Sequence, residues 1–149
     1  MIRLTSKHVP FVERPQNVTD YQITESISID LSQSPDNFSI VCLDKEINYS
    51  EIDNKKPFIT ARMFTIDLYE AKFTFSSGRK FFTLREFCEC ILTAWHAPLS
   101  RRQCKSLSKV FDSFEDIEGV IRLDKVFPPT SLNGLTWSDR MFVPLEMQD

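Results

Sequence analysis

The chain has 149 residues, 42% hydrophobic and 26% charged, which is the size and composition of one globular domain rather than of a disordered segment. Only three glycines occur, which disfavours glycine-rich loops that cradle phosphates, whereas 13 phenylalanines predict a large aromatic core or aromatic surface kept for partners. The net charge of −3 is modest and excludes neither acidic nor basic partners.

The N-terminal region, residues 1–20, holds Pro10 and Pro15 among mixed charges and is predicted to be a flexible or extended arm. Residues 21–149 are expected to form a single α+β domain. The sequence begins without the apolar stretch of a secretory signal, and no run approaches the ~18 apolar residues of a membrane span. We therefore expect an intracellular protein, cytoplasmic or peripheral on the inner membrane face, whose four cysteines stay as free thiols.

Alternating apolar and polar residues over 23–31 predict a half-buried strand. After a turn, residues 38–43 predict a second strand that forms a hairpin with the first. Residues 44–57 are polar and are predicted to be a surface loop.

A longer β-like stretch covers residues 58–75. Its alternation changes phase between Met63 and Phe64 and again near Tyr69, which indicates bulges or two strands joined by a tight bend. Gly78 then provides a turn.

Two helices are predicted next. Thr83 and Glu86 form a capping box that begins the first helix, and Pro98 ends it. Ser100 and Gln103 form a second box. The apolar positions recur at helical spacing, and they predict a core that includes Leu84, Phe87, Ile91, Leu92, Trp95, Leu107 and Phe111.

The remaining residues are predicted to hold one more strand, over 119–127, followed by an irregular C-terminal stretch that packs through Leu135, Trp137 and Phe142. The predicted fold is therefore α+β, with a mixed or antiparallel sheet of about five strands and a two-helix hairpin packed on one side.

Catalytic and metal-binding patterns are not evident. The histidines are His8 and His96, and a Cys104–His96 pair is conceivable, but a histidine at a helix end beside buried thiols is the simpler interpretation. The cysteine and histidine spacings match no zinc pattern. Acidic residues at 112–118 are typical of a solvated helix end or loop. We therefore expect no enzyme activity, no cofactor, no metal and no small-molecule substrate.

Basic residues are concentrated in the middle of the chain. Residues 60–111 hold nine basic and four acidic residues, which gives this segment a net charge of +5 and leaves −8 for the rest of the chain. Basic residues recur every four residues along the second predicted helix and form a stripe on one side of it. We predict an anionic-membrane or RNA-binding surface, weighed against a merely solvated helix face, made of Arg79, Lys80, Arg101, Arg102, Lys105 and Lys109.

The segment 71–87, AKFTFSSGRKFFTLREF, leads into a helix that ends near Trp95, and this order resembles the strand–turn–helix of rhabdovirus matrix proteins. Residues 99–105, LSRRQCK, are similar to the second helix of the small bornavirus-type matrix proteins. The resemblance covers roughly a third of the chain. It implies a non-enzymatic viral structural protein, found in the virion, that self-associates under a membrane and bridges it to a nucleocapsid.

The function expected first is therefore that of a matrix-type assembly protein that forms homo-oligomers and binds an anionic membrane or RNA. One alternative is an intracellular protein–protein adaptor, inhibitor or chaperone. Another is a helix-turn-helix DNA-binding regulator that would read bases with Arg101, Arg102 and Gln103 at the start of its second helix.

Overall fold

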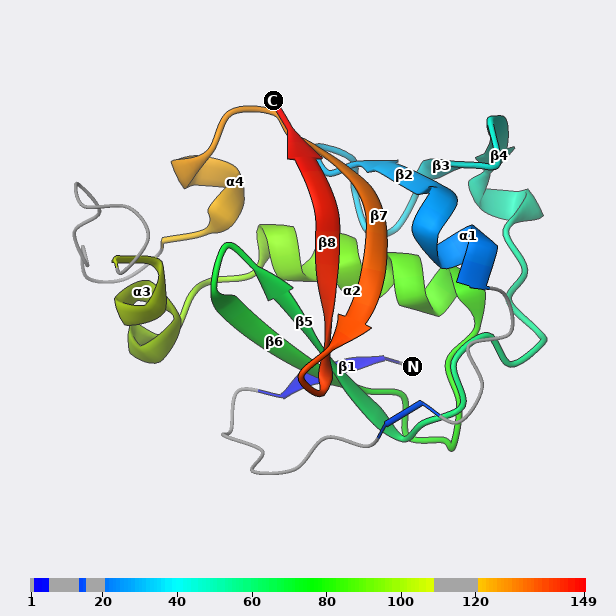
Figure 1. Cartoon of the computed structure of the whole chain (residues 1–149), viewed down its shortest axis with the longest axis horizontal. Helices are drawn as coiled ribbons and strands as arrows, with labels where there is room; N and C mark the ends of the chain where they lie inside the picture. Colours follow the sequence, from blue (N-terminus) through cyan, green and yellow to red (C-terminus); the bar gives the residue numbers. More distant parts are fainter. Residues whose placement is uncertain (1, 6–13, 16–20, 109–120) are drawn as a thin grey trace.

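The computed structural model describes residues 2–5, 14–15, 21–108 and 121–149, and these form one eight-stranded sheet with a few short helices (Figure 1). The expectation of about five strands with a packed two-helix hairpin is therefore wrong. The strands are β1 (Arg3–Thr5), β2 (Ile27–Asp30), β3 (Ser39–Cys42), β4 (Lys45–Asn48), β5 (Met63–Leu68), β6 (Ala71–Ser76), β7 (Ser131–Ser138) and β8 (Met141–Gln148). The helices are α1 (Tyr21–Ser26), α2 (Leu84–His96), α3 (Arg101–Ser108) and α4 (Leu123–Val126), with a 3-10 turn at Tyr49–Glu51.

The C-terminal hairpin β7–β8 lies in the middle of the sheet, whose order is β1-β6-β5-β8-β7-β2-β3-β4. It joins two three-stranded parts, and its link to β5 is the only parallel pairing among the described strands, with Ile66 opposite Phe142. The prediction of an irregular C-terminus is wrong. Pro144 and Gly134 interrupt the apolar alternation, and both residue types normally argue against a central strand.

Two other segments differ from the sequence-based expectation. Residues 23–26 of the strand predicted over 23–31 belong to the helix α1, and only Ile27–Asp30 form the strand β2. The described end of the strand predicted over 119–127 is the short helix α4, in which Leu123 is buried. Segments of four to six residues are too short for periodicity to distinguish a helix from a strand.

Three hairpin turns reverse the chain with two central residues at positive φ and without glycine: Leu43 and Asp44, Tyr69 and Glu70, and Asp139 and Arg140. Positive φ at both positions is the geometry of type I′ turns, for which Asn-Gly is favoured. The phase change at Tyr69 is thus the β5–β6 turn. Strand β4 falls in the predicted surface loop because a short, charged edge strand lacks an apolar pattern.

Replacing Leu43 with Asn and Asp44 with Gly should raise the free energy of unfolding by about 1 kcal/mol, because each L-residue in the left-handed region costs roughly 1–2 kcal/mol. Leu43 is 54% exposed, so little packing is lost. Urea unfolding should show a higher midpoint with an unchanged slope. The same replacement at Tyr69 and Glu70 is the control. It should give no gain, because Tyr69 stacks on Phe127.

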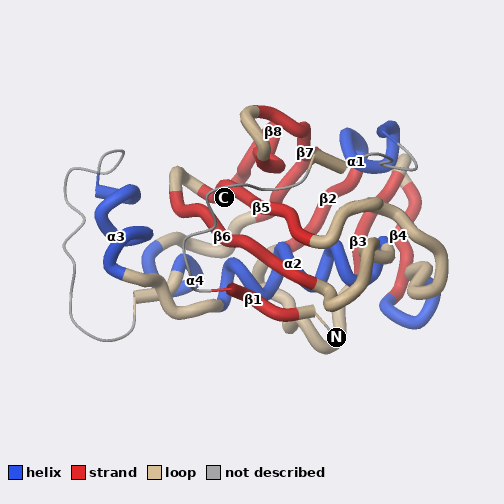
Figure 2. The backbone as a smooth tube through the Cα atoms, turned by 90° about the horizontal axis from the view of Figure 1, so that it is seen from below, coloured by secondary structure: helices blue, strands red, loops and turns tan. Residues whose placement is uncertain are grey.

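Helix α2 lies along the concave side of the sheet, and Figure 2 shows the strands curving over it. Its predicted capping box is present: the Glu86 N–H donates to Thr83 Oγ1 at 3.2 Å, and the Thr83 N–H donates to Glu86 Oε1 at 2.9 Å. Phe64, Phe87 and Phe142 meet between the helix and the sheet. Among the described residues eight phenylalanines are buried, so the aromatic composition serves the core: Phe38, Phe58, Phe64, Phe73, Phe75, Phe82, Phe87 and Phe142.

Helix α3 does not fold back on α2. It packs against β6, and Gln103 Nε2 donates to the carbonyl of Lys72 at 2.6 Å. Between the helices, Pro98 cannot continue α2, and the Leu99 N–H donates to the carbonyl of Ile121 at 2.7 Å. This bond directs the chain beyond the end of α2, where α3 lies in Figure 1. A hairpin was predicted because sequence spacing identifies apolar faces but not the surface that each face contacts.

Candidate anion-binding surface

Helix α3 presents three exposed cations, Arg101, Arg102 and Lys105. The capping box predicted for it is present: the Ser100 N–H donates to Gln103 Oε1 at 2.8 Å, and the Gln103 N–H donates to Ser100 Oγ at 3.2 Å. The opposite face of the helix is fixed to the molecule, because Cys104 and Leu107 are buried. We call the three exposed cations the α3 basic face. The sixth predicted cation, Lys109, lies outside the described residues, as does the predicted core residue Phe111.

Lys72 lies beside the α3 basic face, although it is not among the predicted cations. The contact of Gln103 with the Lys72 carbonyl places the exposed Lys72 next to α3. Only the packing of α3 on β6 brings the two together, and no short-range pattern could have shown this. Asp67 lies opposite Lys72 in the β5–β6 pair. Burial raises the pKa of Asp67, and the nearby Lys72 ammonium acts in the opposite direction.

Arg79 and Lys80 lie away from the α3 basic face. They follow the far end of β6, beyond Ser76, whereas α3 contacts Lys72 near its start. Arg79 is engaged within the molecule, because its guanidinium pairs with Glu86 and lies 4.3 Å from the centre of the Phe81 ring. Lys80 is exposed. The structure therefore does not bring the predicted cations together as one surface.

Gln103 is poorly placed to read a base. Its carbonyl oxygen accepts from Ser100 and its amide nitrogen donates to Lys72, so both ends of the side chain are occupied. Base readout by Gln requires both of these atoms. The start of α3 therefore exposes two guanidinium groups, those of Arg101 and Arg102, but its Gln103 has no free amide for sequence recognition.

The four cysteines, Cys42, Cys88, Cys90 and Cys104, are buried and carry free thiols. Burial raises the pKa of both Cys88 and Cys90 well above the ordinary value, with the Glu89 carboxylate acting in the same direction. The nucleophilic form of cysteine is the thiolate, so these two thiols are held in the unreactive state.

His96 acts as a structural connection between three segments. Its Nε2 lies 3.0 Å from the carbonyl oxygens of both Leu31 and Gln33, and its Nδ1 lies 3.3 Å from Asp124 Oδ2. Both ring nitrogens are therefore engaged, and neither is available as the base that a Cys104–His96 pair requires. His8 and the acidic residues at 112–118 lie outside the described residues.

Within the described ranges, no group of three or more His, Cys, Asp or Glu side chains is arranged to hold a metal ion. Among the described helices, none combines the length and apolar character needed to cross a membrane. The six described members of the predicted core are all buried: Leu84, Phe87, Ile91, Leu92, Trp95 and Leu107.

Comparison with known proteins identifies no relative. No family model matches the sequence, and neither the curated proteins nor the solved structures give a match. The resemblance to viral matrix proteins therefore stays a prediction.

Proposed function

We propose that the chain is a non-enzymatic assembly protein of the matrix type, which binds an anionic membrane through the α3 basic face and self-associates there. The observation that carries this proposal is the exposure of Arg101, Arg102 and Lys105 on a helix whose other face is anchored in the molecule. Lys72 adds a fourth cation beside them. A rigidly mounted group of cations can meet a flat anionic surface without losing the entropy of ordering a flexible segment.

The magnitude of the effect is sufficient for weak, reversible binding. Each Lys or Arg near an anionic leaflet contributes about 1 kcal/mol, so four cations contribute about 4 kcal/mol. Self-association multiplies the number of such contacts, and several weak sites acting together bind far more tightly than one. An oligomer with this face on every copy would therefore be held on a membrane that releases the monomer.

The triple charge reversal Arg101→Glu, Arg102→Glu and Lys105→Glu should reduce binding to phosphatidylserine-containing vesicles by about a hundredfold or more, because three favourable contacts of about 1 kcal/mol each are lost and replaced by repulsion. Co-sedimentation at low and high salt measures this. Wild-type binding should be salt-sensitive and absent from purely zwitterionic vesicles. Light scattering on the same sample gives the oligomeric state.

The matched control reverses Lys45, Lys55 and Lys56, three exposed cations on or after β4 and away from α3. It makes the same change in net charge, so equal loss of binding in both variants would show that net charge alone matters and would remove the α3 basic face from the proposal. The same experiment with single-stranded RNA in place of vesicles identifies the preferred anion. Salt-sensitive binding to RNA but not to vesicles would contradict the membrane proposal.

A further inference from the structure

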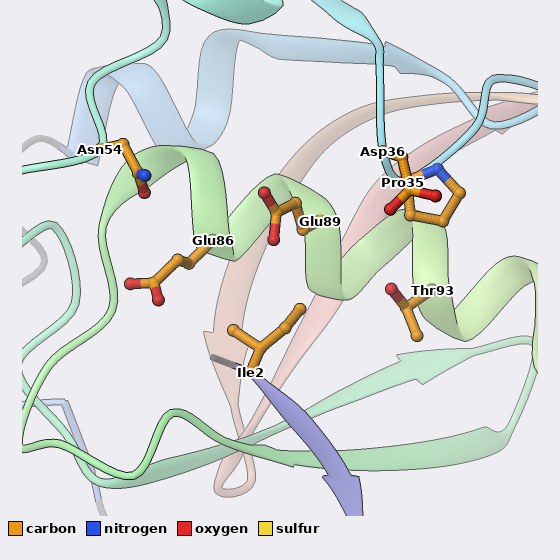
Figure 3. Close-up of a pocket in the computed structure, with 7 residues that line it drawn as sticks. All are labelled: Ile2, Pro35, Asp36, Asn54, Glu86, Glu89 and Thr93. Carbon is orange, nitrogen blue, oxygen red and sulfur yellow. The ribbon is translucent and has the colours of Figure 1, made fainter.

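A groove of about 380 Å³ lies along one side of α2. One wall is Ile2, the residue directly before β1. The other is formed by Pro35 and Asp36, between β2 and β3, and by Asn54. The floor is the polar face of α2, as Figure 3 shows: Glu86, Glu89 and Thr93.

The wall at β1 is an edge of the sheet. Among the described strands β1 pairs only with β6, through Arg3 to Thr5, and stands last in the sheet order. An edge strand carries backbone donors and acceptors that can pair with an additional strand. The other edge, β4, is less suited to such pairing, because the carbonyl of its last residue, Asn48, already accepts from the Ile52 N–H at 3.2 Å.

The groove is acidic. Asp36 and Glu89 contribute carboxylates from its wall and its floor, and Glu86 contributes a third. The floor already binds one cation of the chain, because the guanidinium of Arg79 lies on Glu86. Glu89 accepts only from a neutral donor in its described hydrogen bonds, the Tyr49 hydroxyl at 3.2 Å.

The negative charge of the Glu89 carboxylate is poorly balanced by its surroundings in the free protein. Burial raises the pKa of its carboxyl group, and the neighbouring Glu86 and Asp36 act in the same direction, against the Tyr49 hydrogen bond and the guanidinium of Arg85. Arg85 lies 4.4 Å from the centre of the Tyr49 ring. A carboxylate in this state gains more from an incoming cation than a well-solvated one does.

We propose that the groove is a docking site for an extended, basic segment of a partner protein, which pairs with the edge of β1 that no described strand covers and directs cationic side chains toward Glu89 and Asp36. In an extended strand alternate side chains point to one side, so every second residue would meet the carboxylates. This site is separate from the α3 basic face. A protein that uses both would hold an anionic surface with one and a polypeptide with the other.

The test uses a short fluorescent peptide that alternates Arg and Val, with a Gln–Val peptide as the neutral control. Fluorescence anisotropy with the full chain should show saturable binding at least about tenfold tighter for the Arg peptide, as one charge-assisted contact provides. Combining Asp36→Asn with Glu89→Gln should remove this preference, and the Tyr49 hydroxyl can still donate to Gln at position 89. Binding should weaken as the pH falls through the raised pKa of Glu89.

Two peptides methylated on alternate backbone amides separate strand pairing from simple charge attraction. Only one set of amides faces β1 in a strand, so one methylated peptide should bind and the other should not. The α3 triple reversal should leave peptide binding intact, which keeps this test distinct from the vesicle test. Absence of saturable binding, equal binding of both methylated peptides, or full binding by the Asp36 and Glu89 variant would overturn the proposal.

Discussion

Trp95→Ala should lower the free energy of unfolding by about 3–5 kcal/mol, the usual cost of truncating a buried Trp or Phe. Trp95 is 1% exposed and lies at the end of α2, where its ring stacks near Phe127, with 5.9 Å between ring centres, and meets Tyr69 at 6.3 Å. The side chain thus links α2 to the β5–β6 turn and to the segment after α4. Since a domain is stable by only about 5–15 kcal/mol, urea unfolding should show a much lower midpoint.

The other tryptophan of the chain provides the control. Trp137 in β7 is only half-buried, and its ring contacts Phe142 edge-on with 5.1 Å between ring centres. Trp137→Ala should therefore lower the free energy of unfolding clearly less than Trp95→Ala does. Each variant keeps a single tryptophan, and its fluorescence follows unfolding from a different part of the sheet. An unchanged midpoint for Trp95→Ala, or a larger loss for Trp137→Ala, would contradict the assignment of Trp95 to the core.

Local chemistry made α2 predictable from the sequence. Its capping box is formed by residues three apart, and its apolar positions recur at the spacing of an amphipathic helix. The phase change near Tyr69 indicated either bulges or two strands joined by a tight bend, and the β5–β6 turn lies there, because the alternation changes phase where a strand reverses. Such features depend on neighbours in the chain, so the sequence contains all the information they need.

The centre of the sheet was not predictable in this way. Strand β8 joins β5 through the pair Ile66 and Phe142, which are far apart in the chain, and sequence alternation does not specify partners at that distance. The turn at Asp139 and Arg140 also lacks the Asn-Gly or Asp-Gly signal of a hairpin. Without that signal and with Pro144 in the run, the last 20 residues satisfied the rules for an irregular segment.

The two candidate surfaces also differ in how far the sequence could predict them. The cations of α3 repeat at helical spacing, so the sequence predicted them. Lys72 joins them only through the contact of its carbonyl with Gln103, and Arg79 is excluded because it pairs with Glu86; both contacts are tertiary. The acidic groove combines β1, the segment between β2 and β3, and α2, and no motif connects these segments. A site assembled from distant segments leaves no local pattern to find.

Gly134→Ala should destabilise the protein by about 2–4 kcal/mol, because two unfavourable effects act at one position. Gly134 has φ of +79°, which an L-residue adopts at a cost of roughly 1–2 kcal/mol. A Cβ there would also lie 2.5 Å from the carbonyl oxygen of Glu25 in α1 and 2.9 Å from Leu145 Cδ1. The Leu145 side chain can move, but the Glu25 oxygen is backbone, so α1 must shift away from β7. Thermal or urea unfolding measures the loss.

Gly78→Ala isolates the backbone contribution, because Gly78 has nearly the same φ, +76°, and a Cβ there would meet nothing within 4 Å. Its cost should be about 1 kcal/mol, since the left-handed penalty is partly offset by the smaller conformational entropy of the unfolded alanine chain. The difference between the two variants therefore measures the close approach of α1 to β7. Equal losses would show that α1 yields freely, and that Gly134 is required only for the conformation of its own backbone.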